Sequence, residues 1–128
     1  MQIVEVEQGT EEWFAARRGI PTASEFGKLV TSTGKASTQM GEYINQLIAE
    51  RLGAVDENYS NDWMARGTEL EPAARAWYSF ATDIDTDQVG FVLNDTGTAG
   101  ASPDALYDVS GLEIKCPSPK VHVSYLRG

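Results

Sequence analysis

Residues 102–117 of the chain read SPDALYDVSGLEIKCP, and this stretch decides the fold class and the candidate chemistry. An acidic residue, Asp104, is followed after eight residues by Glu113-Ile114-Lys115. Because side chains alternate along a strand, a strand here would place Glu113 and Lys115 on one face and bury Ile114 on the other. A lysine held beside two carboxylates suits a divalent cation and a water better than it suits a plain core.

The same stretch predicts its own backbone and, with the rest of the chain, the fold class. Ser110-Gly111 is typical of a tight turn between two short strands. Strands are expected over residues 2–7, 89–93, 100–102, 106–109 and 112–116. Helical spacing and capping residues predict helices over residues 10–19, 22–30, 38–52, 62–80 and 121–127, with an acidic loop over 54–60. Pro72 predicts a kink or a break in the fourth helix. Helices followed by an antiparallel meander predict an α+β fold.

Length and composition are those of one compact domain, residues 1–128. The chain is 41% hydrophobic, which is enough to build a core at this length. No apolar run of about 18 residues occurs, so no membrane span is expected. The N-terminal residues lack the basic and then apolar pattern of a signal peptide. The lone cysteine, Cys116, cannot form an internal disulfide, which favours a reducing, cytoplasmic setting.

The charge of the chain does not by itself exclude a nucleic-acid partner. The formal net charge is -9, whereas nucleic-acid-binding proteins usually carry a basic patch. Residues 54–95, however, hold nine acids and only two arginines, so that one segment can form an acidic outer face. Acids that bind a metal ion also raise the negative count, because the bound cation offsets them.

Two interpretations of the acid-x-lysine pattern follow from the residues alone. Mg²⁺ prefers hard oxygen ligands and keeps several waters, so Asp104, Glu113 and one backbone carbonyl are adequate ligands. Lys115 would then hold the attacking water or the scissile phosphate of a phosphodiester. The alternative is a surface hairpin with an ordinary salt bridge, which accounts for the spacing equally well. Trp13, Trp63 and Trp77 are interpreted as core or helix-packing residues, although an aromatic side chain near DNA can also stack on a base.

Four segments that occur in a fixed order favour the metal site over the ordinary salt bridge. They are residues 13–24 (WFAARRGIPTAS), 66–75 (RGTELEPAAR), 102–106 (SPDAL) and 111–117 (GLEIKCP). Together they resemble the lambda-type phage exonucleases, also called YqaJ-like viral recombinases, of the PD-(D/E)xK nuclease superfamily. The resemblance covers roughly residues 7–127. It implies a restriction-endonuclease-like core, in which helices flank a central mixed β-sheet.

The resemblance implies a Mg²⁺-dependent exonuclease, with Mn²⁺ as a possible substitute. Such an enzyme degrades one strand of linear duplex DNA in the 5′-to-3′ direction and leaves a 3′ overhang. In the family the matching aspartate and glutamate, here Asp104 and Glu113, bind the metal with the backbone carbonyl of Ile114. The lysine matches Lys115, and a helix glutamate that serves as a further ligand matches Glu71. These four side chains are the expected catalytic residues.

The resemblance also implies a pocket for the 5′-phosphate of the DNA end. Its matching residues are Arg17, Ser24 and Ser102, and guanidinium and hydroxyl donors suit a phosphate monoester. A simple helix cap accounts for Ser24, and a solvated helix face accounts for Arg17, if no such pocket exists.

The family further implies partners, an assembly and a cellular setting. The expected partners are double-stranded DNA ends and a single-strand annealing protein, and the expected assembly is a homotrimer. The expected setting is the cytoplasm of a bacterial host, with a phage or prophage origin. Family members continue past Gly128, so the chain is expected to be C-terminally shortened. Two alternatives remain: a related endonuclease, and an inactive relative that binds DNA ends or a recombination partner.

Overall fold

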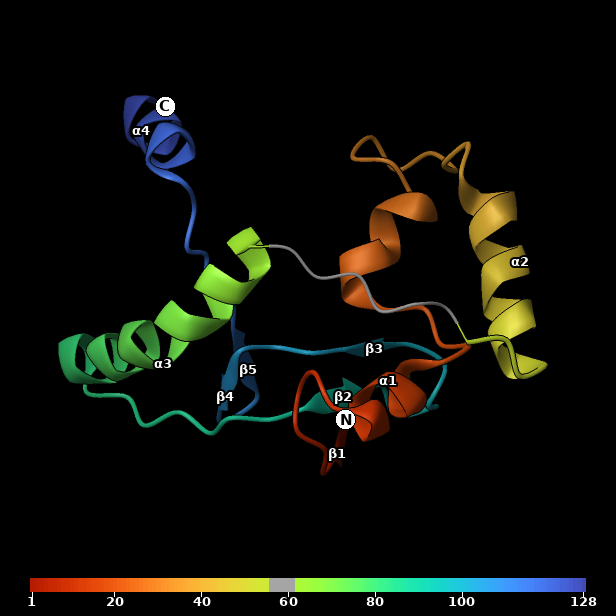
Figure 1. Ribbon diagram of the computed structural model, residues 1–128, viewed down its shortest axis with the longest axis horizontal. Helices are drawn as coiled ribbons and strands as arrows, with labels where there is room; N and C mark the ends of the chain where they lie inside the picture. The colour runs from red at the N-terminus through yellow and green to blue at the C-terminus, as the bar shows by residue number, and fades with distance from the viewer. Residues whose placement is uncertain (56–61) are drawn as a thin grey trace. The chain divides into compact units, whose positions relative to one another are not determined.

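The computed structural model describes the backbone of residues 1–55 and 62–128, and the side chains of residues 1–55 and 65–128. One short strand is followed by a run of helices, then by a run of short strands and a last helix (Figure 1). In chain order they are β1 (Gln2–Val4), α1 (Glu11–Arg17), the 3₁₀ helix η1 (Ala23–Lys28), α2 (Met40–Arg51), α3 (Asp62–Thr82), β2 (Phe91–Leu93), β3 (Gly100–Ala101), β4 (Ala105–Tyr107), β5 (Ser110–Leu112) and α4 (Pro119–Arg127). The predicted α+β class is confirmed.

The chain divides into two compact units, and each is described by itself. One comprises Met1–Glu57 with Val89–Pro103, and the other comprises Asn58–Gln88 with Asp104–Gly128. The expected acidic loop over residues 54–60 lies mostly outside the described residues, as does the side chain of Trp63.

The first unit is built on a three-stranded antiparallel sheet in the order β1-β2-β3. Ile3 pairs with Val92, and Val92 pairs with Ala101 on the other side. Phe91 of the central strand is fully buried and forms the middle of the core. A parallel bridge joins Thr22 to Gly100, so the chain entering η1 lies along the edge strand β3. The expected mixed sheet is therefore present as small antiparallel sheets plus this one parallel bridge among the described residues.

Helix α1 begins as the sequence predicts. The hydroxyl of Thr10 caps it by accepting a hydrogen bond from the Trp13 N–H, and two glutamates follow in the first turn. The helix ends before Gly19, which is buried and has a positive φ of 67°. The end of α2 holds this turn from the other side. The Glu50 carboxylate accepts from the Gly19 N–H, and the Arg51 guanidinium donates to the Gly19 carbonyl at 2.9 Å.

The second unit combines the long helix α3, the β4–β5 hairpin and α4. α3 runs unbroken through Pro72, which shows that the surrounding turns tolerate one missing backbone hydrogen bond. Tyr78 of α3 lies near Tyr107 of β4, with ring centroids 6.3 Å apart. Asp87 and Leu106 exchange two backbone hydrogen bonds, at 2.7 and 2.8 Å, and so tie the segment after α3 to the hairpin.

The structure corrects three details of the predicted backbone. Ser110-Gly111 is not the turn but part of β5, and the chain reverses at Asp108, whose φ is 52°. Aspartate tolerates this left-handed conformation, so the turn does not need the glycine. The expected last strand ends at Leu112, because within the described residues no strand pairs with residues 113–116. Residues 23–28 form a 3₁₀ helix, and the Thr22 side chain makes no capping hydrogen bond.

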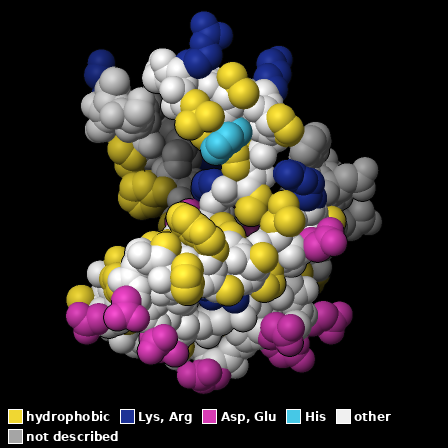
Figure 2. Space-filling view, turned by 90° about the vertical axis from the view of Figure 1, so that its left-hand side faces the viewer, with side chains coloured by type: hydrophobic (Ala, Val, Ile, Leu, Met, Phe, Trp, Pro, Cys, Tyr) yellow, Lys and Arg dark blue, Asp and Glu magenta, His cyan; other side chains and the backbone are white. Residues whose placement is uncertain are grey.

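The exposed surface of the second unit carries large apolar side chains. Trp77 is 69% exposed and Phe80 is 88% exposed on α3, so the prediction that Trp77 is a core residue was wrong. Figure 2 shows hydrophobic side chains spread over this face, with the only histidine, His122, among those of α4. None of the helices in the described part of the chain has the length and apolar character needed to cross a lipid bilayer.

Candidate active site and anion pocket

The β4–β5 hairpin brings the predicted acids of residues 102–117 together. Asp104 stands just before β4, and its backbone N–H donates to the Leu112 carbonyl at 3.0 Å. One oxygen of its carboxylate accepts a hydrogen bond from the Ile114 N–H. The register in which Ala105 pairs with Leu112 thus sets the half-buried Asp104 beside the Glu113-Ile114-Lys115 segment. The second carboxylate oxygen of Asp104 makes no hydrogen bond to a described residue.

Glu113 and Lys115 form an ion pair at the exit of the hairpin. Their side chains are 58% and 71% exposed, so the pair is open to solvent. The hydrogen bond that Lys115 donates to the Glu113 carboxylate raises the pKa of Lys115 above its ordinary value, and the charges of Glu113, Asp104 and Tyr125 act in the same direction. Partial burial opposes them and lowers the pKa of Lys115. Lys115 is therefore a protonated donor at neutral and moderately alkaline pH.

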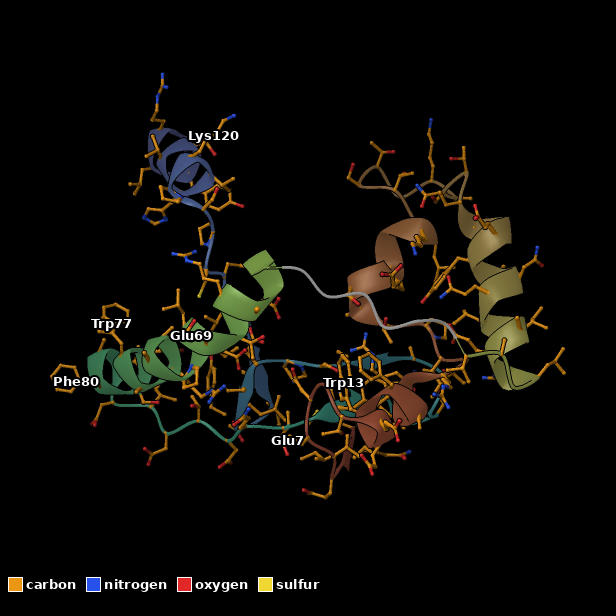
Figure 3. The ribbon with its side chains drawn as sticks, in the orientation of Figure 1. Glu7, Trp13, Glu69, Trp77, Phe80 and Lys120 are labelled. Carbon is orange, nitrogen blue, oxygen red and sulfur yellow. The ribbon has the colours of Figure 1, made fainter. Side chains whose placement is uncertain are left out.

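The third candidate acid, Glu71, is engaged elsewhere. It forms an ion pair with Arg75, one turn further along α3, and both side chains are largely buried. Within the described residues, no group of three or more acidic, histidine or cysteine side chains is arranged to hold a metal ion. The structure therefore brings Asp104, Glu113 and Lys115 together but does not gather Glu71 with them. Glu69, the neighbouring acid on α3, is exposed and labelled in Figure 3.

The oxygen atoms that the hairpin offers are of the kind that bind a hard divalent cation. Asp104 and Glu113 supply carboxylate oxygens, and Ile114 supplies a backbone carbonyl between them, which are ligands that Mg²⁺ accepts. The ion pair with Lys115 shows that the Glu113 carboxylate is already placed next to a positive charge. Glu71 is a candidate for a further ligand only by its match to the motif, since its carboxylate is paired with Arg75.

A second group of candidate residues lies in the first unit. The guanidinium of Arg17, at the end of α1, donates from Nη1 to the Ser102 hydroxyl oxygen at 2.9 Å. The indole of Trp13, one turn earlier on α1, donates to the same oxygen at 3.0 Å and to the Gly90 carbonyl at 2.9 Å. The Arg17 guanidinium also lies over the Trp13 ring, 4.0 Å from its centroid. Figure 3 labels Trp13 on this helix.

The guanidinium of Arg17 is half-buried. Among the described residues, no carboxylate lies within ion-pairing distance of its guanidinium. Burial lowers the pKa of Arg17, and the more distant Tyr43 and Glu25 partly offset this effect. Arginine stays charged even so. A charge held in this way, with the Ser102 hydroxyl beside it, suits a bound anion.

Ser24, the third candidate for phosphate contact, is not joined to this pair. It is exposed at the start of η1, and its hydroxyl lies 3.3 Å from that of Thr22. Thr22 is in turn bridged to Gly100, two residues before Ser102. The structure thus brings Arg17 and Ser102 into contact and leaves Ser24 on a neighbouring segment of the same unit.

Two residues that hold this region, Gln8 and Trp13, were not among the predicted site residues. Gln8 donates from its side-chain amide to the Val89 carbonyl at 3.0 Å and to the Pro103 carbonyl at 2.9 Å, so it fixes both ends of the 89–103 segment. No pattern in the sequence marks a glutamine for this purpose. Trp13 was interpreted as a packing residue, or as an aromatic side chain that can stack on a base, and not as a partner of Arg17 and Ser102. Its spacing of four residues from Arg17 on a helix was a signal that the two side chains meet.

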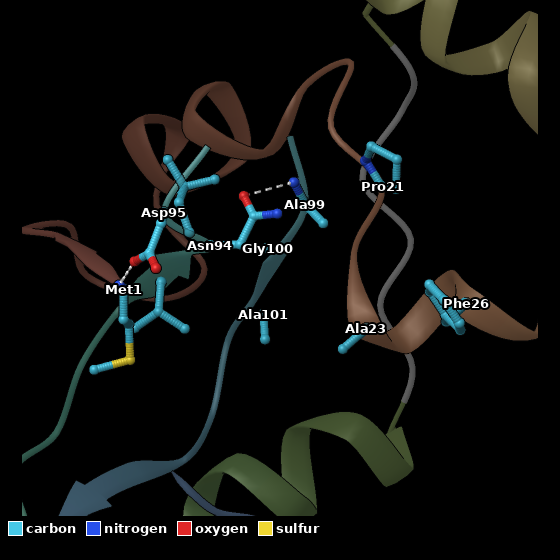
Figure 4. Close-up of a pocket in the computed structure, with 11 residues that line it drawn as sticks. Met1, Pro21, Ala23, Phe26, Asn94, Asp95, Ala99, Gly100 and Ala101 are labelled. Carbon is cyan, nitrogen blue, oxygen red and sulfur yellow. Dashed lines mark hydrogen bonds and ion pairs between the residues drawn. The ribbon is translucent and has the colours of Figure 1, made fainter. Parts of the chain in front are cut away.

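A separate hollow of about 700 Å³ in the first unit has a different character. Figure 4 shows it between β2, β3 and η1, where apolar side chains such as Pro21, Phe26 and Val92 supply most of its lining. The dashed ion pair in that view joins the amino group of Met1 to Asp95 at the rim. No free positive charge lines this hollow within the described residues, so it does not suit a phosphate.

Comparison with known proteins identifies the family of the chain. The family model of the YqaJ-like viral recombinase domain matches residues 12–128. The chain therefore belongs to the YqaJ-like viral recombinase family, and its resemblance to that family is confirmed.

Two solved structures give the likeness in three dimensions. One is the alkaline exonuclease LHK-Exo from Laribacter hongkongensis, at 42% identity and a TM-score of 0.76. The other is LHK-Exo in complex with dAMP, at 43% identity and a TM-score of 0.77. Each alignment covers 92% of this chain and 59% of the solved chain, so the present chain spans about three fifths of their length. A search of curated proteins found no match.

Proposed function

We propose that the chain acts as a Mg²⁺-dependent exonuclease that degrades one strand of linear duplex DNA from a 5′-phosphorylated end. Membership of the viral recombinase family and likeness to an alkaline exonuclease support a nuclease role. The observation that carries the finer proposal is the Arg17–Ser102 pair, a half-buried cation and a hydroxyl with no acid partner among the described residues. A relative at 43% identity was solved with dAMP, which is a nucleoside monophosphate.

In this proposal Arg17 and Ser102 bind the terminal 5′-phosphate, with Ser24 as a further donor from η1. The guanidinium supplies charge and directed N–H donors, and the serines supply hydroxyl donors. Binding at the phosphate sets the polarity, because only a strand with a free 5′ end places its terminal phosphate in such a pocket. Cleavage then runs 5′ to 3′ and leaves a 3′ overhang.

The residues of the hairpin perform the hydrolysis. Asp104, Glu113 and the Ile114 carbonyl would hold Mg²⁺ or Mn²⁺, with Glu71 as an additional ligand. When bound, the cation offsets the charge that develops on the phosphorus oxygens and lowers the pKa of a coordinated water. Lys115 donates hydrogen bonds to the attacking water or the scissile phosphate, and its raised pKa keeps it protonated for this purpose.

The test is digestion of four substrates by the purified chain with and without Mg²⁺. These are linear duplex with a 5′-phosphate, the same duplex with a 5′-hydroxyl, a closed circle and single-stranded DNA. We expect loss of the 5′-phosphorylated linear duplex only, abolished in Lys115→Ala and retained in Lys120→Ala, which changes an exposed lysine of α4. Cutting of the circle would replace the proposal with an endonuclease. Binding of DNA ends without digestion would replace it with a non-catalytic relative.

The proposed partners follow from the same activity. The 3′ overhang is the substrate of a single-strand annealing protein, and double-stranded DNA ends are the other partner. A homotrimer is the proposed assembly, which size-exclusion chromatography with light scattering would measure directly. The proposed setting is the cytoplasm of a bacterial host that carries the chain on a phage or prophage.

A further inference from the structure

The hydroxyl of Ser102 accepts two hydrogen bonds at once. Trp13 Nε1 donates to it at 3.0 Å, and Arg17 Nη1 donates to it at 2.9 Å. Neither donor can act as an acceptor, because an indole N–H and a guanidinium have no lone pair to offer. The direction of both bonds is therefore fixed by the chemistry of the partners.

Because the Ser102 hydroxyl accepts two hydrogen bonds, the only further hydrogen bond it can make is one in which it donates. A hydroxyl has two lone-pair sites and one O–H donor, so two incoming donors occupy the lone pairs and leave the hydrogen to point elsewhere. The Ser102 hydroxyl donates no hydrogen bond to any described residue. Its O–H is thus a donor held ready for an acceptor that comes from outside, next to the unneutralised charge of Arg17.

From this arrangement we propose that Trp13 is a positioning residue for the 5′-phosphate: together with Arg17 it turns the Ser102 hydroxyl into an obligatory donor to a phosphate oxygen. The inference rests on the proposed function, because it deepens the phosphate pocket described there. Trp13 acts through Ser102 and need not touch the phosphate itself.

Trp13 also orients Arg17, the second phosphate donor of the proposed pocket. The centroid of its ring lies 4.0 Å from the Arg17 guanidinium carbon, so the guanidinium is held over the indole while it donates to Ser102. The indole N–H is shared between Ser102 and the Gly90 carbonyl, so the ring is anchored to the segment that leads into β2. One side chain on α1 therefore orients both phosphate donors.

Replacing Trp13 by phenylalanine tests the contribution of the indole N–H apart from that of the aromatic ring. Trp13→Phe keeps an aromatic face under Arg17 but leaves the Gly90 carbonyl without its donor. The Ser102 hydroxyl is then free to turn and donate to that carbonyl, and it is lost as a donor to phosphate. The charge of Arg17 is unchanged, so binding of DNA with a 5′-hydroxyl end should change little.

The test is the ratio of dissociation constants for two hairpin duplexes, one ending in a 5′-phosphate and one in a 5′-hydroxyl. Fluorescence anisotropy with a dye in the hairpin loop, in EDTA, measures the ratio without digestion. We expect Trp13→Phe to lower the preference of the wild-type chain for phosphate by about tenfold, the usual effect of one hydrogen bond to a charged group. Ser102→Ala should lower it by a similar factor, and the double variant by no more than Ser102→Ala alone. Trp77→Phe, at a 69% exposed tryptophan, is the matched control and should keep the wild-type ratio.

Each result decides between distinct conclusions. A wild-type preference for phosphate that survives Trp13→Phe, or losses that add in the double variant, would overturn the role of Trp13 and leave the phosphate pocket in place. A wild-type chain with no preference would instead overturn the pocket and with it the proposed function. If Trp13→Phe does not fold, benzothienylalanine at position 13 replaces only the N–H by sulfur and must give the same loss of preference.

Discussion

The region around Arg17 and the region around Glu113 differ in the sign of the charge that they hold. Around Arg17 a positive charge is half-buried with hydroxyl and aromatic neighbours, and no acid within the described residues neutralises it. Around Glu113 the negative charges are half-buried at Asp104 and exposed at Glu113, and Glu113 is already paired with Lys115. The first region therefore suits an anion, and the carboxylates of the second region suit a cation.

The difference lies also in how each region is held. The Arg17 region is cross-linked by side chains from distant segments, such as Trp13 to Ser102 across 89 positions of sequence. The Asp104 region is local, because one hairpin brings together residues ten positions apart. The first arrangement depends on tertiary packing, and the second depends mainly on the register of two short strands. Substitutions should therefore damage the first through the fold and the second through charge.

The largest expected effect is on the hairpin acids. Asp104→Asn keeps an oxygen that can accept from the Ile114 N–H but removes the charge, so we expect thermal stability close to the wild type. Digestion of 5′-phosphorylated duplex should fall by about a hundredfold or more, because a bound metal stabilises the transition state by several kcal/mol. Asp108→Asn, on an exposed turn residue of the same hairpin, is the control and should keep activity. Full activity of Asp104→Asn would remove this residue from the metal site.

The next effect breaks the packing beneath the Arg17 region. A side chain at Gly90 would place its Cβ 1.7 Å from the Val6 carbonyl oxygen, and backbone cannot yield as a flexible side chain can. We expect Gly90→Ala to lower the free energy of unfolding by about 3 kcal/mol, measured by urea denaturation. Gly41→Ala is the opposite control, since that position of α2 is open and alanine favours a helix by about 0.5–1 kcal/mol. Equal stability of the two variants would contradict the close approach at Gly90.

A smaller effect sharpens the role of Arg17. Arg17→Lys keeps a positive charge but loses the planar set of donors and the stacking on Trp13. We expect the preference for a 5′-phosphate end over a 5′-hydroxyl end to fall by about tenfold, measured by the same anisotropy assay in EDTA. Arg18→Lys, at the exposed neighbour, should leave the preference unchanged. An equal loss of binding to both DNA ends would show that Arg17 attracts DNA through its charge and does not recognise the 5′-phosphate specifically.

The smallest effect concerns the Glu113–Lys115 pair. The hydrogen bond that Lys115 donates to Glu113 is the main cause of the raised pKa of Lys115, so Glu113→Gln should lower that pKa toward its ordinary value. The sign follows for stability: the pair contributes fully below the unfolded pKa of lysine, and the contribution is lost as the pH rises through the raised folded pKa. An NMR titration of the lysine side chain checks the shift, with Glu69→Gln as the control. An unchanged pKa of Lys115 in Glu113→Gln would mean that the pair does not form in solution.

The sequence by itself determined the helices and the candidate residues. Thr10 and the glutamates after it predict the start of α1, and apolar spacing predicts α2, because these signals lie within one or two turns of the residues they govern. The ordered motifs around Arg17, Asp104 and Lys115 indicated the family, which the match over residues 12–128 confirmed.

Only the tertiary structure decided the strands and the contacts. A strand exists where a partner offers backbone groups, and residues 113–116 have none in the described chain although their pattern alternates. The turn moved to Asp108 because pairing of Ala105 with Leu112 fixed the register of the hairpin. Trp13 meets Ser102, and Gln8 meets Pro103, only when the chain is folded. Local rules read neighbours in sequence, whereas these contacts depend on which distant segments pack together.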